Sequence, residues 1–248
     1  MFRLQNRLRE LADKSFRQNL FTFTGFLGLS EQEIFWRMEN ELRYAGFTLF
    51  GGRNEAERRL IRFGNAGDLG YEEAFPVVCI HIRPVFPKFA DSLSHRDFLG
   101  ALMNLGIERS TLGDILVGEG EAYLFCLDSI AQYICGSLEQ IKHTRVKCGI
   151  TADFAEIPVK EPEKQRVQVN SLRVDALIAK VYNKSRGDCL ELFREGKVFV
   201  DGRLCENNSR ALKGGETVNA RGYGKFICMG EARATKKGKL DVEVAVFR

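Results

Sequence analysis

Membrane and secretion signals are missing from the sequence. The longest apolar run, FPVVCIHI at residues 75–82, is well short of the ~18 residues that a membrane helix needs, and it fits a buried strand. The opening residues, MFRLQNRLRELADK, alternate charged with apolar side chains, which is unlike a secretory signal peptide. We therefore expect a cytoplasmic protein that has no membrane partner.

Patterns typical of metal and redox sites are also scarce. The seven cysteines are all at least nine residues apart, so there is no CxxC motif, and their odd number argues against a disulfide framework. Only three histidines occur, at positions 81, 95 and 143, and none belongs to a pair with ligand spacing. We predict buried free thiols, no bound metal and no cofactor.

Proline is rare and marks a boundary. Three of the five prolines bracket the strand at 75–82, and Pro158 and Pro162 lie in a polar segment with few large apolar residues. We expect this segment, 153–170, to be a linker. A chain of 248 residues with 44% apolar and 28% charged residues suits two or three globular domains.

The charges are unevenly distributed along the chain. Residues 1–165 hold 20 Lys and Arg against 23 Asp and Glu, whereas residues 166–248 hold 17 against 10. A basic module usually binds a polyanion, and nucleic acid is the commonest one. The alternative is a solvated basic surface, so charge alone favours nucleic acid only modestly.

Residues 1–70 are predicted to be a helical N-terminal region. Apolar residues recur at helical spacing in the first turns, and Ser30 with Glu33 fits a capping box for a second helix that Gly46 ends. Within 51–63, a glycine turn and four arginines predict a short basic helix. The secondary RNA contacts that we expect in the first two domains are Arg58, Arg59 and Arg96.

Residues 75–152 show the order β-α-β-β-α-β. Ser94 is placed to cap the first helix, with Asp97 near its positive end. The order predicts a ferredoxin-like domain, the arrangement that RNA-recognition domains share. However, the third strand, EAYLFCL, lacks the aromatic RNA-stacking signature, and many proteins of other function have this order.

Residues 171–248 are predicted to form a module of two short helices and several strands that ends in a β-hairpin. Asp201-Gly202 is a tight-turn signal. Cationic residues lie at element ends, and Ser185 opens the second helix, where backbone amides favour phosphate. The lysines at 236, 237 and 239, at the tip of the hairpin, are further candidates for phosphate contacts. The predicted RNA-binding residues are Arg173, Lys184, Ser185, Arg186, Lys197, Arg203, Arg221, Tyr223 and Lys225.

The motifs of this module resemble a known RNA-binding domain. The pattern R-x-D, SR, EGxVxVDG, GGE and RGxGKF, at residues 173–226, is similar to the S-four type domain of ribosomal small-subunit proteins. Together with FTFTGFL at 21–27, the GG…EAERR segment at 51–59 and residues 88–116, it makes the chain resemble the YlmH family of bacterial RNA-binding proteins. The resemblance implies rRNA or tRNA as partner, the large ribosomal subunit as the place of action, and rescue of stalled peptidyl-tRNA complexes.

Enzyme motifs are incomplete. His95-Arg96-Asp97 resembles a kinase catalytic loop, but Asn104 is too far along the chain to supply the asparagine of that motif. The glycine-rich segment 64–70 lacks the spacing of a dinucleotide-binding loop. We predict no catalytic residues.

The sequence thus predicts an α+β protein that binds structured RNA without catalysis. Its parts are the helical region 1–70, the ferredoxin-like βαββαβ domain 75–152, the linker 153–170 and the S-four type helix-helix-β module 171–248. Two alternatives stay open. One is a protein-interaction adaptor linked to cell division, in which the N-terminal region binds a protein partner, and the other is an RNA-modifying enzyme.

Overall fold

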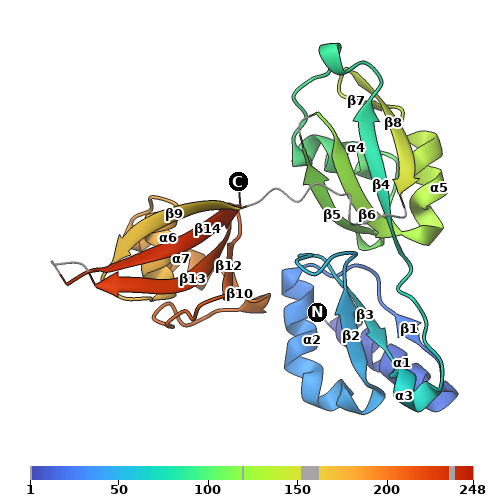
Figure 1. Ribbon diagram of the computed structural model, residues 1–248. Coiled ribbons are helices and arrows are strands. Elements are labelled where there is room, and N and C mark those ends of the chain that lie inside the picture. Colours follow the sequence, from blue (N-terminus) through green and yellow to red (C-terminus); the bar gives the residue numbers. More distant parts are fainter. Residues whose placement is uncertain (1, 119, 152–161, 235–237, 248) are drawn as a thin grey trace. The chain divides into compact units, whose positions relative to one another are not determined.

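The chain folds into two compact units. A computed structural model describes residues 2–118, 120–151, 162–234 and 238–247, the side chains of 231–234 excepted (Figure 1). The two units are Met1–Pro158 and Val159–Arg248. Both combine helices with antiparallel sheets, which confirms the α+β class. Among the helices of the described residues, none is both long and apolar enough to cross a membrane.

The first part of the N-terminal unit is a mixed layer of helices and strands. Its three-stranded sheet has the order β1-β3-β2, and its core contains the fully buried side chains of Leu8, Phe35 and Phe63. The elements are α1 (Phe2–Gln18), β1 (Thr22–Phe23), α2 (Leu29–Leu42), η1 (Arg43–Ala45), β2 (Phe47–Phe50), β3 (Leu60–Phe63) and α3 (Ala66–Leu69).

The strands correct the prediction that this region is helical. No helix lies within 51–63, where a basic one was predicted, because Leu60–Phe63 forms β3. All four residues of β3 are buried, since β1 and β2 pair with it on both sides. The buried charge of Arg62 is compensated by an ion pair with Glu72 at 2.5 Å and by a cation–π contact with the ring of Phe21. The segment 60–63 is therefore the central strand of the sheet, and not part of a basic surface helix.

The second helix begins earlier than its sequence signal predicts. The N-cap of α2 is Gly28, and the carboxylate of Glu31 accepts the N–H of Gly28 at 2.7 Å. Ser30 therefore lies inside the helix, and the prediction of a Ser30–Glu33 capping box is wrong. Gly46, with φ +63°, ends the helical segment as predicted.

The central part has the predicted order β-α-β-β-α-β, with one short extra strand before the last. The sheet order is β5-β6-β4-β8-β7, all antiparallel. Helices α4 and α5 cover one face of this sheet, where Ile80, Phe98 and Ile134 are buried (Figure 1). The elements are β4 (Val77–Pro84), η2 (Pro87–Phe89), α4 (His95–Asn104), η3 (Arg109–Thr111), β5 (Leu112–Val117), β6 (Ala122–Leu127), α5 (Asp128–Ser137), β7 (Gln140–Ile141) and β8 (Thr144–Thr151).

The N-terminal part packs against the opposite face of this sheet. Cys79 and Phe125, which point away from α4 and α5, are buried against Phe26 and Leu60. The fit is close at Gly52, where a β-carbon would lie 2.2 Å from Cδ1 of Phe125. Elsewhere on this face, the cross-strand partners Arg83 of β4 and Lys147 of β8 are exposed.

The C-terminal unit is a six-stranded antiparallel sheet with two helices. The sheet order is β11-β10-β12-β13-β14-β9, and Leu177, Ile178 and Leu192 of the helices are buried against Phe226. Asp201 and Gly202 both have positive φ in the tight turn before β11, as predicted. The elements are β9 (Glu163–Val169), α6 (Val174–Val181), α7 (Arg186–Arg194), β10 (Val198–Val200), β11 (Arg203–Leu204), β12 (Thr217–Ala220), β13 (Gly224–Ala234) and β14 (Leu240–Phe247).

Strand β9 corrects the predicted linker 153–170. Residues 152–161 lie outside the described residues, but Glu163–Val169 pairs with β14 along its whole length. The segment has a polar sequence because β9 is the edge strand of the sheet, and Val169 is its only buried residue. A polar composition therefore marks an exposed edge here, and not an unstructured connection.

Candidate RNA-binding surface of the C-terminal unit

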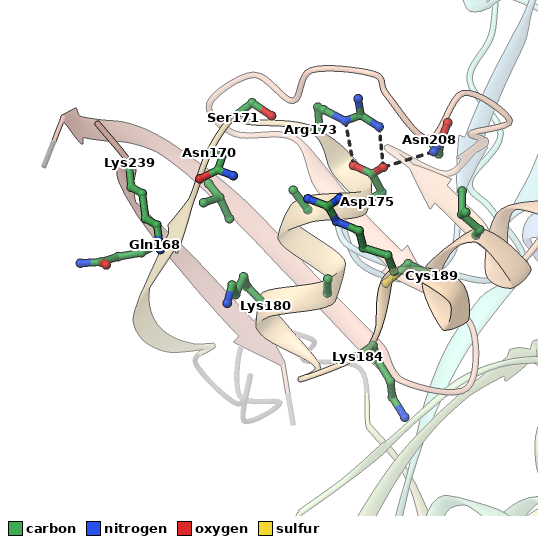
Figure 2. Close-up of a pocket in the computed structure, with 15 residues that line it drawn as sticks. Gln168, Asn170, Ser171, Arg173, Asp175, Lys180, Lys184, Cys189, Asn208 and Lys239 are labelled. Atoms are coloured by element: carbon green, nitrogen blue, oxygen red, sulfur yellow. Dashed lines mark hydrogen bonds and ion pairs between the residues drawn. The ribbon is translucent and has the colours of Figure 1, made fainter. Parts of the chain in front are cut away.

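A basic cleft opens between β9 and the two helices of the C-terminal unit. Its volume is about 690 Å³. Figure 2 shows cationic and polar side chains around it, and Asp175 is the only carboxylate among the residues that line it. The cationic lining residues, which we call the cleft cations, are Arg173, Lys180, Lys184, Arg186 and Lys239.

Arg173 is held by the helix that it precedes. It is the N-cap of α6, and its Nε and Nη2 donate to the two carboxylate oxygens of Asp175 at 3.0 and 2.7 Å. Asn208 donates to the same carboxylate at 3.2 Å (Figure 2). The Arg173 side chain is 42% exposed. Two of its five N–H groups hold Asp175, so the others are available for a phosphate.

The N-terminus of α7 is already capped by its own side chains. Ser185 Oγ accepts the N–H of Asp188, and the Ser185 N–H donates to the Asp188 carboxylate, both at 3.1 Å. These hydrogen bonds lower the pKa of Asp188, which places a negative charge at the helix N-terminus. The geometry opposes the prediction that Ser185 and these amides bind phosphate, because the carboxylate competes for that place.

Two predicted residues meet across the module. Nζ of Lys184, in the turn between the helices, lies 4.4 Å from the ring centroid of Tyr223. Tyr223 belongs to the turn between β12 and β13 and is 43% exposed. Its ring also lies 6.1 Å from that of Tyr182. The contact places a cation and an exposed aromatic ring side by side.

The other predicted residues fall at two ends of the sheet. Lys197 and Arg221 are neighbours, since the Arg221 N–H donates to the Lys197 carbonyl oxygen at 2.9 Å, and Lys197 Nζ pairs with Glu195 at 2.7 Å. Lys225 lies nearby on β13, over the ring of Phe247. Arg203, beside the turn at the far end of β10, is not brought to this group.

Two cleft cations, Lys180 and Lys239, were not among the nine residues predicted to bind RNA. Lys180 was missed, although it is an exposed cation in the last turn of α6 and the sequence analysis had placed cations at element ends. Lys239 lies in the predicted hairpin and lines the cleft. The two hairpin lysines at 236 and 237 lie outside the described residues.

Arg58 serves the fold of the N-terminal unit. Its guanidinium donates to the carbonyl oxygens of Phe26, Leu112 and Arg109 at 2.9, 2.9 and 3.1 Å, and burial lowers its pKa. These contacts oppose the prediction that Arg58 contacts RNA, because three of its five N–H groups have partners in the protein and the side chain is partly buried.

Arg59 and Arg96 differ in whether their side chains are held by the protein. Arg59 Nε donates to the Ala56 carbonyl at 2.7 Å, which ties the side chain to its own loop and weakens its prediction as well. Arg96 is exposed on α4, beside a second cleft of about 520 Å³ that Asp97 and Lys142 also line. Only Arg96 of the secondary contacts keeps an exposed position.

The cysteines have no reactive features. All seven are free, and five are buried as predicted, whereas Cys135 and Cys148 are only partly buried. Burial raises the pKa of Cys79, Cys126 and Cys148 to about 12, so these thiols stay protonated at neutral pH. Among the described residues, no three His, Cys, Asp or Glu side chains gather to hold a metal ion.

Comparison with known proteins agrees with the resemblance that the motifs indicate. Residues 71–156 match the family model of the putative RNA-binding domain in YlmH. The chain is 28% identical over 232 residues to ribosome-associated protein quality control protein P2 of Bacillus subtilis, a match that covers 93% of this chain and 88% of the relative. A solved structure, the cell division protein YlmH from Streptococcus pneumoniae, is similar with a TM-score of 0.49 and 19% identity, over 62% of this chain and 93% of that one. The family-model match and the relative from Bacillus subtilis bear out the resemblance to the YlmH family.

Proposed function

We propose that this YlmH-like chain is a non-catalytic, cytoplasmic RNA-binding protein that docks on structured rRNA or tRNA of the large ribosomal subunit. Its task there is in translation, in the rescue of stalled peptidyl-tRNA complexes. The observation that carries the proposal is the basic cleft of the C-terminal unit. The quality-control relative in Bacillus subtilis supports the ribosomal setting, since the match extends over nearly the whole chain.

The charge of the cleft favours an RNA backbone as its ligand. Five cations against one carboxylate line the cleft, and Lys180 and Arg186 are exposed. Such a surface binds phosphates through charge and shape and does not read base edges in a duplex. The exposed ring of Tyr223 beside Lys184 adds a place where an unpaired base can stack.

The experiment is sedimentation of the tagged protein with ribosomes through a gradient, at low and moderately high salt. The test variant K180Q/K184Q/R186Q removes three cleft cations, and the control R3Q/R7Q/K14Q removes three exposed charges of α1. We expect the wild type and the control to migrate with the large subunit. The test variant should dissociate at lower salt, because each lost phosphate contact lowers the slope of log affinity against log salt by ~0.7–0.9.

Two results would contradict the proposal. One is unchanged migration of the test variant at every salt concentration. The other is migration of the wild type only at the top of the gradient, even at low salt. That result would favour the adaptor role, with a protein partner for the N-terminal region. The RNA-modifying alternative predicts a change in nucleotide mass that is lost on gene deletion.

A further inference from the structure

The central sheet has a second basic surface that the C-terminal cleft does not explain. Cross-strand pairs place Arg83 opposite Lys147, and His81 opposite both Tyr123 and Gly149. Directly paired residues of an antiparallel sheet point to the same face. Because Ile82 and Leu124 are buried under the helices, their neighbours in sequence point to the helix-free face. We call the part of it formed by His81, Arg83, Tyr123, Arg145, Lys147 and Gly149 the open sheet face.

Two stacked rings stand at the centre of the open sheet face. The rings of His81 and Tyr123 are nearly parallel, with centroids 4.4 Å apart and an interplanar angle of 5°. Nε2 of His81 lies 2.7 Å from Oε2 of Glu121, and the Tyr123 hydroxyl donates to Oε1 of the same carboxylate at 3.4 Å. One side chain thus holds both rings in place.

The neighbouring strand leaves room for another ring. On the side away from Tyr123, the cross-strand partner of His81 is Gly149, and a β-carbon at that position would meet nothing within 4 Å. No side chain of β8 therefore covers His81 at this row of the sheet. A flat base can continue the stack there, over the glycine.

Four exposed cations follow the stacked rings, on β4, on β8 and in the segment after β4. Arg83 and Lys147 form the next row of the sheet, Arg145 lies two residues before Lys147, and Lys88 follows in the loop after β4; all four are exposed. None of them forms an ion pair with a carboxylate among the described residues. The charge of this surface suits a polyanion more than the apolar face of a protein.

The loop after β4 adds exposed aromatic rings. Phe86 is 62% and Phe89 86% exposed, an unusual state for such large apolar side chains. Asp91 holds the end of the loop against β8, since its N–H donates to Oγ1 of Thr144 at 2.8 Å and its carboxylate accepts the His143 N–H at 3.0 Å. The two phenylalanines are therefore presented by an anchored loop.

We propose that the open sheet face binds single-stranded RNA, with bases stacked on His81 and on Phe86 or Phe89, and phosphates held by Arg83, Arg145 and Lys147. Exposed rings beside cations are the means by which proteins bind unpaired nucleotides, because a duplex keeps its bases stacked inside. The inference extends the proposed function: the chain has two RNA surfaces that differ in the form of RNA they bind.

The test measures binding of the full chain to two labelled probes, a 12-nucleotide oligo(U) and a stable RNA hairpin. Variant R83Q/K147Q should lower the salt slope for oligo(U) by about 1.4 and leave the hairpin unaffected. Variant K184Q/R186Q in the basic cleft should do the reverse, and R3Q/K14Q on α1 controls for the lost charge. For the ring, H81A should weaken oligo(U) binding about 5-fold or more, whereas H81F keeps a stacking surface and should bind nearly normally.

A cross-linking experiment locates the site directly. Oligo(U) that contains 5-iodouridine should, on irradiation, attach to peptides that include 77–90 or 122–127. Attachment confined to 159–248, or oligo(U) affinity unchanged in a folded R83Q/K147Q variant, would overturn the inference. Failure of the wild type to bind oligo(U) would also overturn it and would leave the open sheet face to a protein partner. Loss of hairpin binding alone would count against the proposed function of the C-terminal unit and not against this site.

Discussion

Lys184 lies over the ring of Tyr223, with 4.4 Å between Nζ and the ring centroid. The contact joins the turn between α6 and α7 to the turn between β12 and β13, which are almost forty residues apart in sequence. It places a cleft cation and an exposed ring in one surface, although the two residues come from separate segments of the sequence. The RNA-binding surface that we propose is therefore assembled from both halves of the module.

Removal of the Tyr223 ring should weaken binding of structured RNA. We expect Y223A to lower the affinity for an RNA hairpin about 2- to 5-fold, because an exposed cation–π contact contributes ~0.5–1 kcal/mol. Y223F keeps the ring and should bind within about 2-fold of the wild type. Fluorescence anisotropy at fixed salt measures both affinities, and equal losses in the two variants would point to the hydroxyl instead of the ring.

Replacement of Arg58 should destabilise the N-terminal unit. R58M keeps the apolar stem but removes the charged donor to the carbonyl oxygens of Phe26, Leu112 and Arg109. The Leu112 and Arg109 oxygens keep a second donor, from the Arg109 side chain and the Leu112 N–H respectively. We expect the free energy of unfolding to fall by about 2–4 kcal/mol, since these are charged hydrogen bonds in a partly buried place. Urea denaturation measures the change. R59M is the matched control, and its cost should stay near ~1 kcal/mol, because Arg59 makes only one short hydrogen bond, to Ala56, and a second, long one to Asn54.

A methyl group at Gly52 should be poorly tolerated. G52A combines positive φ, at +95°, with a β-carbon 2.2 Å from Cδ1 of Phe125. The expected loss is about 2–4 kcal/mol, from backbone strain and overpacking together. G70A has the same type of strain, with φ +77°, but nothing within 4 Å of the new carbon, and should cost about 1 kcal/mol. Similar losses in the two variants would show that strain alone decides.

Asp97 should make stability depend on acid. Its hydrogen bonds with Lys142 and Ser94 lower its pKa to about 2. A carboxyl whose pKa is lower in the folded than in the unfolded state stabilises the fold above the unfolded pKa. That contribution is lost as the pH falls from the ordinary aspartate pKa towards about 2. We expect the urea midpoint of the wild type to fall more steeply over this window than that of D97N. Parallel curves would contradict the assignment.

Helix limits show where local sequence suffices. The Ser94 cap forms as predicted, with the Ser94 N–H donating to the Asp97 carboxylate at 2.8 Å, because all its atoms lie within one turn. The Ser30 cap fails because Glu31 finds Gly28 one turn earlier. The segments that begin at Ser94 and at Ser30 both fit a capping pattern in the sequence. Only the first forms, because α2 already begins after Gly28.

The candidate site was only partly predictable. Sequence motifs identify Arg173 and Arg186, and the placement of cations at element ends identifies Lys184; all three line one cleft. They do not show that the Ser185 cap is occupied by Asp188, or that Lys180 joins the cleft. Arg58 and Arg96 both look like free cations in the sequence, yet one holds three carbonyl groups and the other is exposed. A cation's role depends on acceptors that distant segments supply.

By itself, the sequence determined the α+β class, the βαββαβ order of the central part apart from the short strand β7, the two helices of the C-terminal part, and the tight turn at Asp201-Gly202. These follow from periodicity, capping and backbone preference, which act between near neighbours. Only the tertiary structure decided that Glu163–Val169 is an edge strand, that Arg58 is internal, and that His81 stacks on Tyr123. Each of these depends on a partner dozens of residues away, brought into contact by burial of the sheets, and no local pattern records which partner that is.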